Sequence, residues 1–334
     1  MLNRVVVSEK NLKRFQEFQY EKFGKRYLDY RKHWESPLEE ILSQVTFPMY
    51  LMLEQSFLCN LKCITCIHSD KHTGYKKKHL QKSVMPIDLL DSILAQAKSH
   101  SLPAISMHSN DEPLLLKDID VRIKKCREAD IMEIFLTTNG TLMNESVAEK
   151  IIQAGVSHVL FSIDAAEAST YEKIRGESFF DKVLLNIKNF NKIRNALNGG
   201  LYPIIRASFV VSRYNQTQIN DFISKFSSFV DFIEFQSFQK FHTETDDFIP
   251  LGAKQVQDFS CSEVFKKLII RANGDILPCC TWYGYDLVLG NVYRDKLEDI
   301  FNNNAQLNLI RENSLSKNYS LQSCQQCSKS FYAL

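Results

Sequence analysis

Hydrophobic residues along the chain fall into short runs that alternate with longer amphipathic segments. The short runs have the length and composition of β-strands, and they lie at residues 49–53, 104–108, 132–137, 158–163, 204–211 and 232–237. Apolar residues at helical spacing predict helices over residues 86–98, 118–129, 144–154, 169–175, 180–197 and 216–228. Strands that alternate with helices pair in parallel through right-handed crossovers. The pattern therefore predicts an α/β fold, either an open barrel or a doubly wound sheet.

Both ends of the chain depart from this alternation. Aromatic residues at near-helical spacing within residues 11–30 predict a helical extension over residues 1–48. Beyond residue 238, the segments 267–271 and 275–277 flank Asn273 and Gly274, a pair that favours a tight hairpin turn. We therefore expect a strand–helix domain over residues 49–238 and a smaller hairpin-containing domain over residues 239–334.

Composition and charge exclude several classes of protein. The 334 residues are 44% hydrophobic and 24% charged, which is ordinary for a globular chain. A formal net charge of +2 gives no electrostatic reason to expect a nucleic acid or a membrane as partner. The longest apolar runs are far shorter than the roughly 20 residues of a membrane helix, and the charged N-terminus does not resemble a secretory signal. We expect a cytoplasmic protein.

The cysteines carry the first chemical signal. The chain has nine, and an odd count without a secretory signal argues against a disulfide framework. Cys59, Cys63 and Cys66, here called the first cysteine set, follow a predicted strand in the phrase C-N-L-K-C-I-T-C. Three thiolates on a four-iron cluster leave one iron without a protein ligand, and an open position is where chemistry occurs. The alternative is a zinc site that takes His68 or His72 as its fourth ligand.

Four more cysteines lie near the C-terminus. Cys261, Cys279, Cys324 and Cys327, here called the second cysteine set, have the spacing C-x17-C-x44-C-x2-C. Four thiolates close a metal site, so this site serves electron transfer or structure, and zinc and an iron–sulfur cluster fit the spacing equally well. Cys280 is either a substitute ligand or a spare buried thiol. Cys126 falls within a predicted helix and is expected in the core.

At the first cysteine set the sequence resembles the radical S-adenosylmethionine (SAM) enzymes, whose cluster motif is C-x3-C-x2-C. The resemblance continues in order through S-N-D-E-P-L-L (109–115), T-T-N-G-T-L (137–142), S-I-D-A-A (162–166) and Y-E-K-I-R-G (171–176). The tail resembles the SPASM/twitch extension of that family in L-I-I-R-A-N-G-D-I-L-P-C-C and in L-G-N-V followed by K-L-E-D-I-F. Its cysteine layout is most similar to the aminocyclitol dehydrogenase of aminoglycoside biosynthesis.

This resemblance implies a partial (β/α)6 barrel with a small C-terminal twitch/SPASM-like domain. It implies a [4Fe-4S] cluster that binds SAM on the first cysteine set and one auxiliary [4Fe-4S] cluster on the second. Glu112, with the backbone around Asp111, would contact the methionyl ammonium, and Ser162 and Asp164 would contact the ribose or methionyl group. Thr65 would lie beside the adenine. Two departures from the family pattern are Thr65, where an aromatic residue is common, and Asn110-Asp111, where the family has two glycines.

The activity implied is hydrogen abstraction through a 5'-deoxyadenosyl radical, after reduction by a flavodoxin or ferredoxin-type protein. We expect oxidation or dehydration of a sugar or cyclitol-like small molecule, with the auxiliary cluster as electron acceptor. Lys240 and Arg213 are candidate substrate contacts. Lys76, Lys77 and Lys78 form a basic loop that would attract an anionic substrate, unless it is simply a solvated surface loop. The alternatives are a peptide maturase and a non-catalytic iron–sulfur protein, and the sequence identifies no general base.

Overall fold

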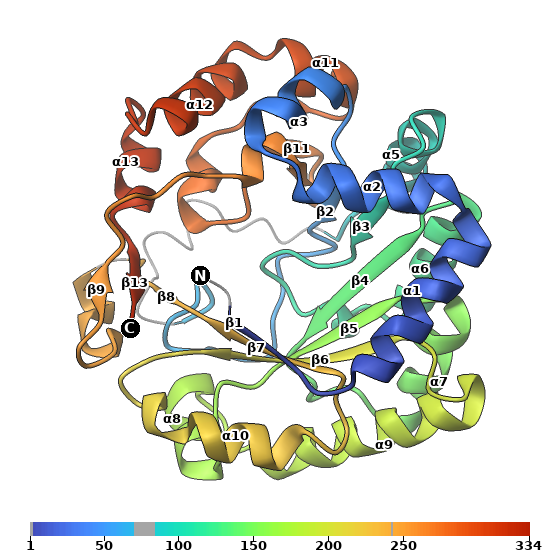
Figure 1. Cartoon of the computed structure of the whole chain (residues 1–334), viewed down its shortest axis with the longest axis vertical. Coiled ribbons are helices and arrows are strands. Elements are labelled where there is room, and N and C mark those ends of the chain that lie inside the picture. The colour runs from blue at the N-terminus through green and yellow to red at the C-terminus, as the bar shows by residue number, and fades with distance from the viewer. Residues whose placement is uncertain (1–2, 70–83, 242) are drawn as a thin grey trace.

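The centre of the fold is a curved parallel sheet with helices on its outer side. The computed structural model of the protein describes residues 3–69, 84–241 and 243–334. Neighbouring parallel strands follow the order of the chain: β2 (Tyr50–Leu53), β3 (Ala104–Ser106), β4 (Glu133–Thr138), β5 (His158–Ser162), β6 (Ile204–Val210) and β7 (Phe232–Gln236). The connecting helices cover the outer side (Figure 1): α5 (Ile87–Ser99), α6 (Ile119–Glu128), α7 (Glu145–Ala154), α8 (Ala168–Arg175), α9 (Phe180–Asn198) and α10 (Ile219–Phe226). This confirms the partial (β/α)6 barrel.

Alternate strand residues face the helices and the inside of the barrel. In β4, Ile134 and Leu136 are completely buried, whereas Phe135 and Thr137 are partly exposed on the inner side. This alternation is the period-two pattern of a strand with two different faces. The helices bury the outer face, and the inner face remains available for chemistry.

The N-terminal segment adds one strand and three helices. Strand β1 (Asn3–Val6) pairs antiparallel with β7 and extends the sheet beyond the barrel. The helices that follow are α1 (Glu9–Phe23), α2 (Lys25–Glu35) and α3 (Leu38–Gln44). Gly24, with φ of 57°, separates α1 from α2. The extension is therefore helical as expected but begins with a strand, which is too short for the hydrophobic pattern to reveal.

The C-terminal segment joins the other edge of the same sheet. Strands β10 (Lys267–Ile270) and β11 (Asp275–Leu277) form the expected hairpin, with Gly274 at φ of 88°. Strand β10 also pairs in parallel with β2, and β12 (Gly290–Asn291) pairs with β11, so the hairpin continues the barrel sheet. The remaining elements are β8 (Phe238–Gln239), β9 (Lys254–Gln255), β13 (Phe331–Ala333), α11 (Leu297–Asn303), α12 (Ala305–Ser316) and α13 (Gln322–Ser328). No described helix has both the length and the apolar character that a membrane crossing requires.

Candidate active site

The first cysteine set lies on the loop that follows β2. Cys63 is buried, whereas Cys59 and Cys66 are partly exposed. The N–H of Cys66 donates to the carbonyl of Cys63 at 2.9 Å. Burial raises the pKa of the Cys59 and Cys66 thiols to about 12, and the charge of the neighbouring thiols acts in the same direction. The three thiols are therefore close enough to repel one another as thiolates, and a bound cation would favour their ionised form.

The chemistry of this donor set fits a cluster. In the described part of the chain, no three Cys, His, Asp or Glu side chains converge on one point where a single metal ion would bind. The thiolates of a four-iron cluster bind different iron atoms, so a cluster does not need that convergence. His68, an alternative zinc ligand, is buried, and its Nε2 donates to the carbonyl of Asn110 at 2.6 Å. His72, the other alternative, lies outside the described residues.

Arg175, at the end of α8, contacts the first cysteine set at Cys63. One guanidinium nitrogen lies 3.8 Å from the Cys63 sulfur, and another lies 2.6 Å from a carboxylate oxygen of Asp164. The other oxygen of Asp164 accepts from the N–H of Val210 at 2.8 Å. Asp164 is therefore engaged in a buried ion pair, and Glu167, not Asp164, occupies the N-cap of α8. Arg175 belongs to the Y-E-K-I-R-G motif, but the spacing of the motifs along the chain does not predict that its side chain contacts Cys63 and Asp164.

Replacing Arg175 tests whether its ion pair with Asp164 stabilises the structure around the cysteine loop. An Arg175→Met substitution is expected to lower the free energy of unfolding by about 3 kcal/mol, because it leaves the Asp164 carboxylate buried without its cation. Urea denaturation of the purified protein measures this loss. Adding Asp164→Asn to the variant should recover part of the stability. An unchanged unfolding free energy for the single variant would contradict a supporting role.

Glu112 ties three of the sequence motifs together. Its carboxylate accepts from the Thr138 hydroxyl and from the N–H of Asn139, each at 2.7 Å, and from the N–H of Leu114 at 3.1 Å. Its own N–H donates to the carbonyl of Leu58 at 2.8 Å, beside the first cysteine set. Burial raises the pKa of Glu112 to about 7, and these hydrogen bonds oppose the rise. The S-N-D-E-P and T-T-N-G loops thus meet at the cysteine loop.

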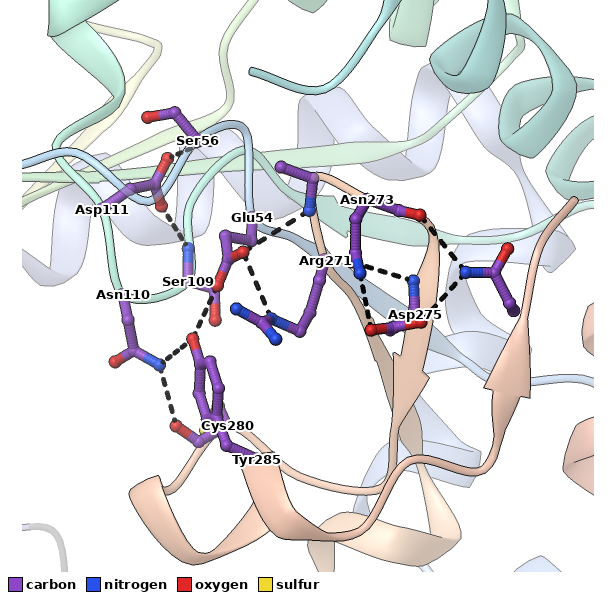
Figure 2. A network of polar contacts seen from close by, with 12 residues as sticks. Glu54, Ser56, Ser109, Asn110, Asp111, Arg271, Asn273, Asp275, Cys280 and Tyr285 are labelled. Carbon is purple, nitrogen blue, oxygen red and sulfur yellow. Dashed lines mark hydrogen bonds and ion pairs between the residues drawn. The ribbon is translucent and has the colours of Figure 1, made fainter. Parts of the chain in front are cut away.

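The other predicted cofactor contacts occupy the same end of the barrel. The Asp111 carboxylate is half-buried and accepts from the N–H groups of Ser56 and Ser109, at 3.2 and 2.9 Å (Figure 2). Thr65 lies within the cysteine loop and is partly exposed. Ser162, the last residue of β5, is also partly exposed. All of these residues lie at or beyond the carboxyl ends of barrel strands, where an α/β fold places its site.

The two predicted substrate contacts, Lys240 and Arg213, both interact with other groups of the protein. The Lys240 ammonium lies 2.5 Å from a carboxylate oxygen of Asp246. Arg213 is exposed, and its Nε donates to the carbonyl of Ile249 at 3.2 Å. The basic loop with residues 76–78 lies outside the described residues.

The second cysteine set surrounds a single cavity. All four of its members line one small cavity, together with Tyr283 and Gly284. A Cβ atom on Gly284 would come within 2.6 Å of both the sulfur and the carbonyl oxygen of Cys279, so only glycine fits there. Cys280 does not line this cavity and packs, with Cys66, against a small apolar cluster around Phe57. Four thiols around one space fit a closed cluster.

The inside of the barrel holds ionisable groups that the sequence did not identify. Nδ1 of His108 accepts from the Ser106 hydroxyl at 2.7 Å and from the N–H of Thr137 at 3.3 Å. Burial lowers the pKa of His108 to about 3, and the positive charges of Lys267 and Arg206 add to that effect. The imidazole is therefore neutral. The signal that could have found such residues is strand parity, which places alternate strand residues inside the barrel.

Arg206 and Lys267 also line a larger cavity at the amino ends of the strands. Arg206 pairs with Glu234 through an Nε–Oε1 contact of 2.9 Å. The aromatic rings of Tyr50 and Phe135 share this cavity, which lies beneath α1 and α2. Paired charges and aromatic faces thus make the barrel interior amphipathic and not uniformly apolar.

Comparison with known proteins gives two family matches. Residues 54–204 match the radical SAM superfamily, and residues 261–328 match the iron–sulfur cluster-binding domain called SPASM. GTP 3',8-cyclase from Clostridium botulinum is 29% identical over 178 residues, and probable GTP 3',8-cyclase from Saccharolobus islandicus is 25% identical over 173 residues. Each match covers 52% of this chain and 51% of the relative, so the chain spans about half the length of these curated relatives.

Solved structures share the fold at low sequence identity. SuiB from Streptococcus suis bound to the precursor peptide SuiA aligns with a TM-score of 0.62 at 19% identity, covering 91% of this chain and 74% of SuiB. Native anSMEcpe with bound AdoMet gives 0.61 at 16% identity, covering 84% and 88%. BtrN in complex with AdoMet and 2-DOIA gives 0.52 at 16% identity, covering 80% and 86%. In the family matches, the first cysteine set falls within the segment that matches the radical SAM superfamily, and the second falls within the segment that matches the SPASM domain.

Proposed function

We propose that the chain is a radical SAM enzyme with a C-terminal SPASM domain and that it oxidises a sugar or cyclitol-like small molecule. When bound, SAM and its [4Fe-4S] cluster supply the 5'-deoxyadenosyl radical, and the auxiliary cluster supplies an electron acceptor. Oxidation of an alcohol to a ketone then balances as one hydrogen atom lost from carbon, one electron lost to the acceptor and one proton lost to water. The protein's own side chains would bind and orient the clusters, SAM and the substrate.

We assign the cluster ligands to the two cysteine sets. Cys59, Cys63 and Cys66 would hold the cluster that binds SAM, and the second set would hold the auxiliary cluster. Glu112 would accept from the methionyl ammonium with the free lone pair of its Oε2 atom, since that oxygen accepts one protein hydrogen bond from Asn139. Ser162 and Thr65, which are partly exposed at the same end of the barrel, are proposed to contact the ribose and the adenine.

The observation that carries the oxidation is the single cavity lined by four thiols. A cluster with four thiolate ligands has no open iron for a substrate, so it serves electron transfer or structure, and we propose electron transfer. An electron acceptor is what a net oxidation requires and what an elimination or an epimerisation does not. One auxiliary cluster therefore supports dehydrogenation over the other outcomes of hydrogen abstraction.

A small polar substrate is supported by the inside of the barrel. His108, just beyond the carboxyl end of β3, offers a neutral polar ring, and Thr137, near the carboxyl end of β4, is partly exposed inside the barrel. Such polar groups suit the hydroxyl groups of a small substrate. BtrN, a fold relative, was solved with AdoMet and 2-DOIA, which makes 2-DOIA the first compound to test.

The test is anaerobic turnover of the reconstituted protein with SAM, dithionite and a panel of sugars, cyclitols and short peptides. A sugar or cyclitol substrate should stimulate release of 5'-deoxyadenosine and yield a carbonyl product, and deuterium from its oxidised carbon should appear in the 5'-deoxyadenosine. Stimulation by peptides alone would replace this proposal with peptide maturation. Iron and SAM binding without any 5'-deoxyadenosine would identify a non-catalytic iron–sulfur protein.

A further inference from the structure

Asn110 joins three segments that the sequence keeps far apart. Its carbonyl oxygen accepts from Nε2 of His68, two residues beyond Cys66 of the first cysteine set. Its side-chain amide donates to the Tyr285 hydroxyl at 2.8 Å and to the carbonyl of Cys280 at 3.5 Å (Figure 2). Cys280 is the immediate neighbour of Cys279 in the second set. One residue of the S-N-D-E-P loop therefore contacts the surroundings of both proposed clusters.

The Tyr285 side of this contact is rigidly held. The Tyr285 hydroxyl donates to Oε2 of Glu54 at 2.6 Å, and Glu54 is completely buried. Oε1 of Glu54 lies 3.4 Å from Nε of Arg271, whose guanidinium stacks 4.6 Å from the centre of the Tyr285 ring. Figure 2 shows these groups as one connected network. A buried network of hydrogen bonds and ion pairs has few alternative arrangements, so a displacement at one end is expected to reach the other.

The SAM side is equally constrained. Asp111 fixes the loop through the N–H groups of Ser56 and Ser109, and Glu112 follows directly in the chain. A shift of Asn110 would therefore also shift Glu112, our proposed partner of the methionyl ammonium. Glycine at position 110 has no side chain and could not make the two amide contacts. The asparagine, a departure from the family's pattern at this position, is what completes the connection.

We propose that Asn110 is a positioning residue that couples SAM affinity to occupancy of the auxiliary cluster site. The inference rests on the proposed function, because it takes the two cysteine sets as cluster sites. A cluster in the auxiliary site would fix the position of Cys279 and, through it, of the Cys280 carbonyl and Tyr285. Asn110 contacts both of these groups, so the loop that carries Glu112 would be fixed as well. Coupling free energies are reciprocal, so bound SAM should in turn favour retention of the auxiliary cluster.

The test is a double-mutant cycle read out as the SAM dissociation constant under anaerobic conditions. Cys324→Ala/Cys327→Ala removes the auxiliary site, and in the native background it should weaken SAM binding about five- to tenfold. In the Asn110→Ala background the same cysteine changes should have no further effect on SAM binding. Tyr285→Phe, which deletes only one hydroxyl, should reduce the coupling in the same direction. An independent readout is the electron paramagnetic resonance signal of the reduced auxiliary cluster, which SAM should perturb in the native protein but not in Asn110→Ala.

Asn198→Ala is the matched control. Its side-chain amide donates to the carbonyl of Tyr202 at the end of α9, outside both cysteine sets, and its loss should leave the coupling intact. Equal iron content and an unchanged Tm of the Asn110→Ala protein would show that folding is preserved. Effects of Asn110→Ala and of the cysteine changes that simply multiply would overturn the inference while leaving the enzyme assignment intact. A native protein that binds iron but no SAM would overturn both.

Discussion

Replacing Cys63 with alanine is expected to remove about half of the iron that the reconstituted protein binds and to abolish release of 5'-deoxyadenosine. Cys63 is the buried middle member of the first cysteine set, and the guanidinium of Arg175 lies 3.8 Å from its sulfur. Two remaining thiolates would leave two irons of the cluster without protein ligands, so the cluster would be lost. Iron and sulfide content, followed by turnover with SAM and dithionite, measure both effects.

Cys126→Ala provides the matched control for this experiment. Cys126 is also a buried cysteine, but it lies within α6, where its sulfur is 3.5 Å from the sulfur of Met107. Its replacement should cost about 1 kcal/mol of stability by leaving a small cavity, and it should leave iron content and SAM cleavage unchanged. Normal iron content and SAM cleavage in the Cys63→Ala protein would remove the basis of the proposed function.

Local signals explain why most barrel elements could be predicted from the sequence. Helix α7, for example, is capped at its start by Asn144, whose side chain accepts from the N–H of Val147, and at its end by Gly155 with φ of 96°. The pairings of β1 with β7 and of β10 with β2 could not be predicted in this way. They join segments that are distant in the chain, and a short strand carries no local mark of the edge it will extend. The C-terminal hairpin could thus be anticipated, but not its place in the barrel sheet.

In the candidate site, too, local features could be predicted from the sequence, whereas contacts between distant segments could not. Cysteine spacing and the order of the motifs are local features, so the two cysteine sets and Glu112 could be proposed as site residues from the sequence. The ion pair between Arg175 and Asp164 and the contacts of Asn110 depend on how separate loops meet, which no spacing records. The ion pair between Lys240 and Asp246 likewise joins two side chains whose contact no motif predicts.

A Gly284→Ala substitution is expected to deplete the auxiliary cluster and to lower substrate oxidation about 100-fold, while SAM cleavage in the absence of substrate persists. The added Cβ atom would lie 2.6 Å from both the carbonyl oxygen and the sulfur of Cys279. Real Cβ contacts do not occur at that distance, and one of the two opposing atoms belongs to the backbone, so Cys279 itself must move. A displaced ligand cannot keep its place around the shared cavity, and changes beside a metal ligand typically cost 10- to 100-fold in affinity.

Gly252→Ala separates this steric effect from the general cost of replacing a glycine. Gly252 is exposed, and a Cβ atom there would meet nothing within 4 Å, although its φ of 82° adds some backbone strain. The control should therefore lose a little stability and keep both clusters. Iron content and the auxiliary-cluster signal in electron paramagnetic resonance distinguish the two variants. If Gly284→Ala retained full iron and normal oxidation, the cavity would not be the cluster site, and the four thiols around it would need another explanation. If it lost the cluster yet still oxidised substrate, the electron would have to leave by another acceptor, and the auxiliary cluster would be structural.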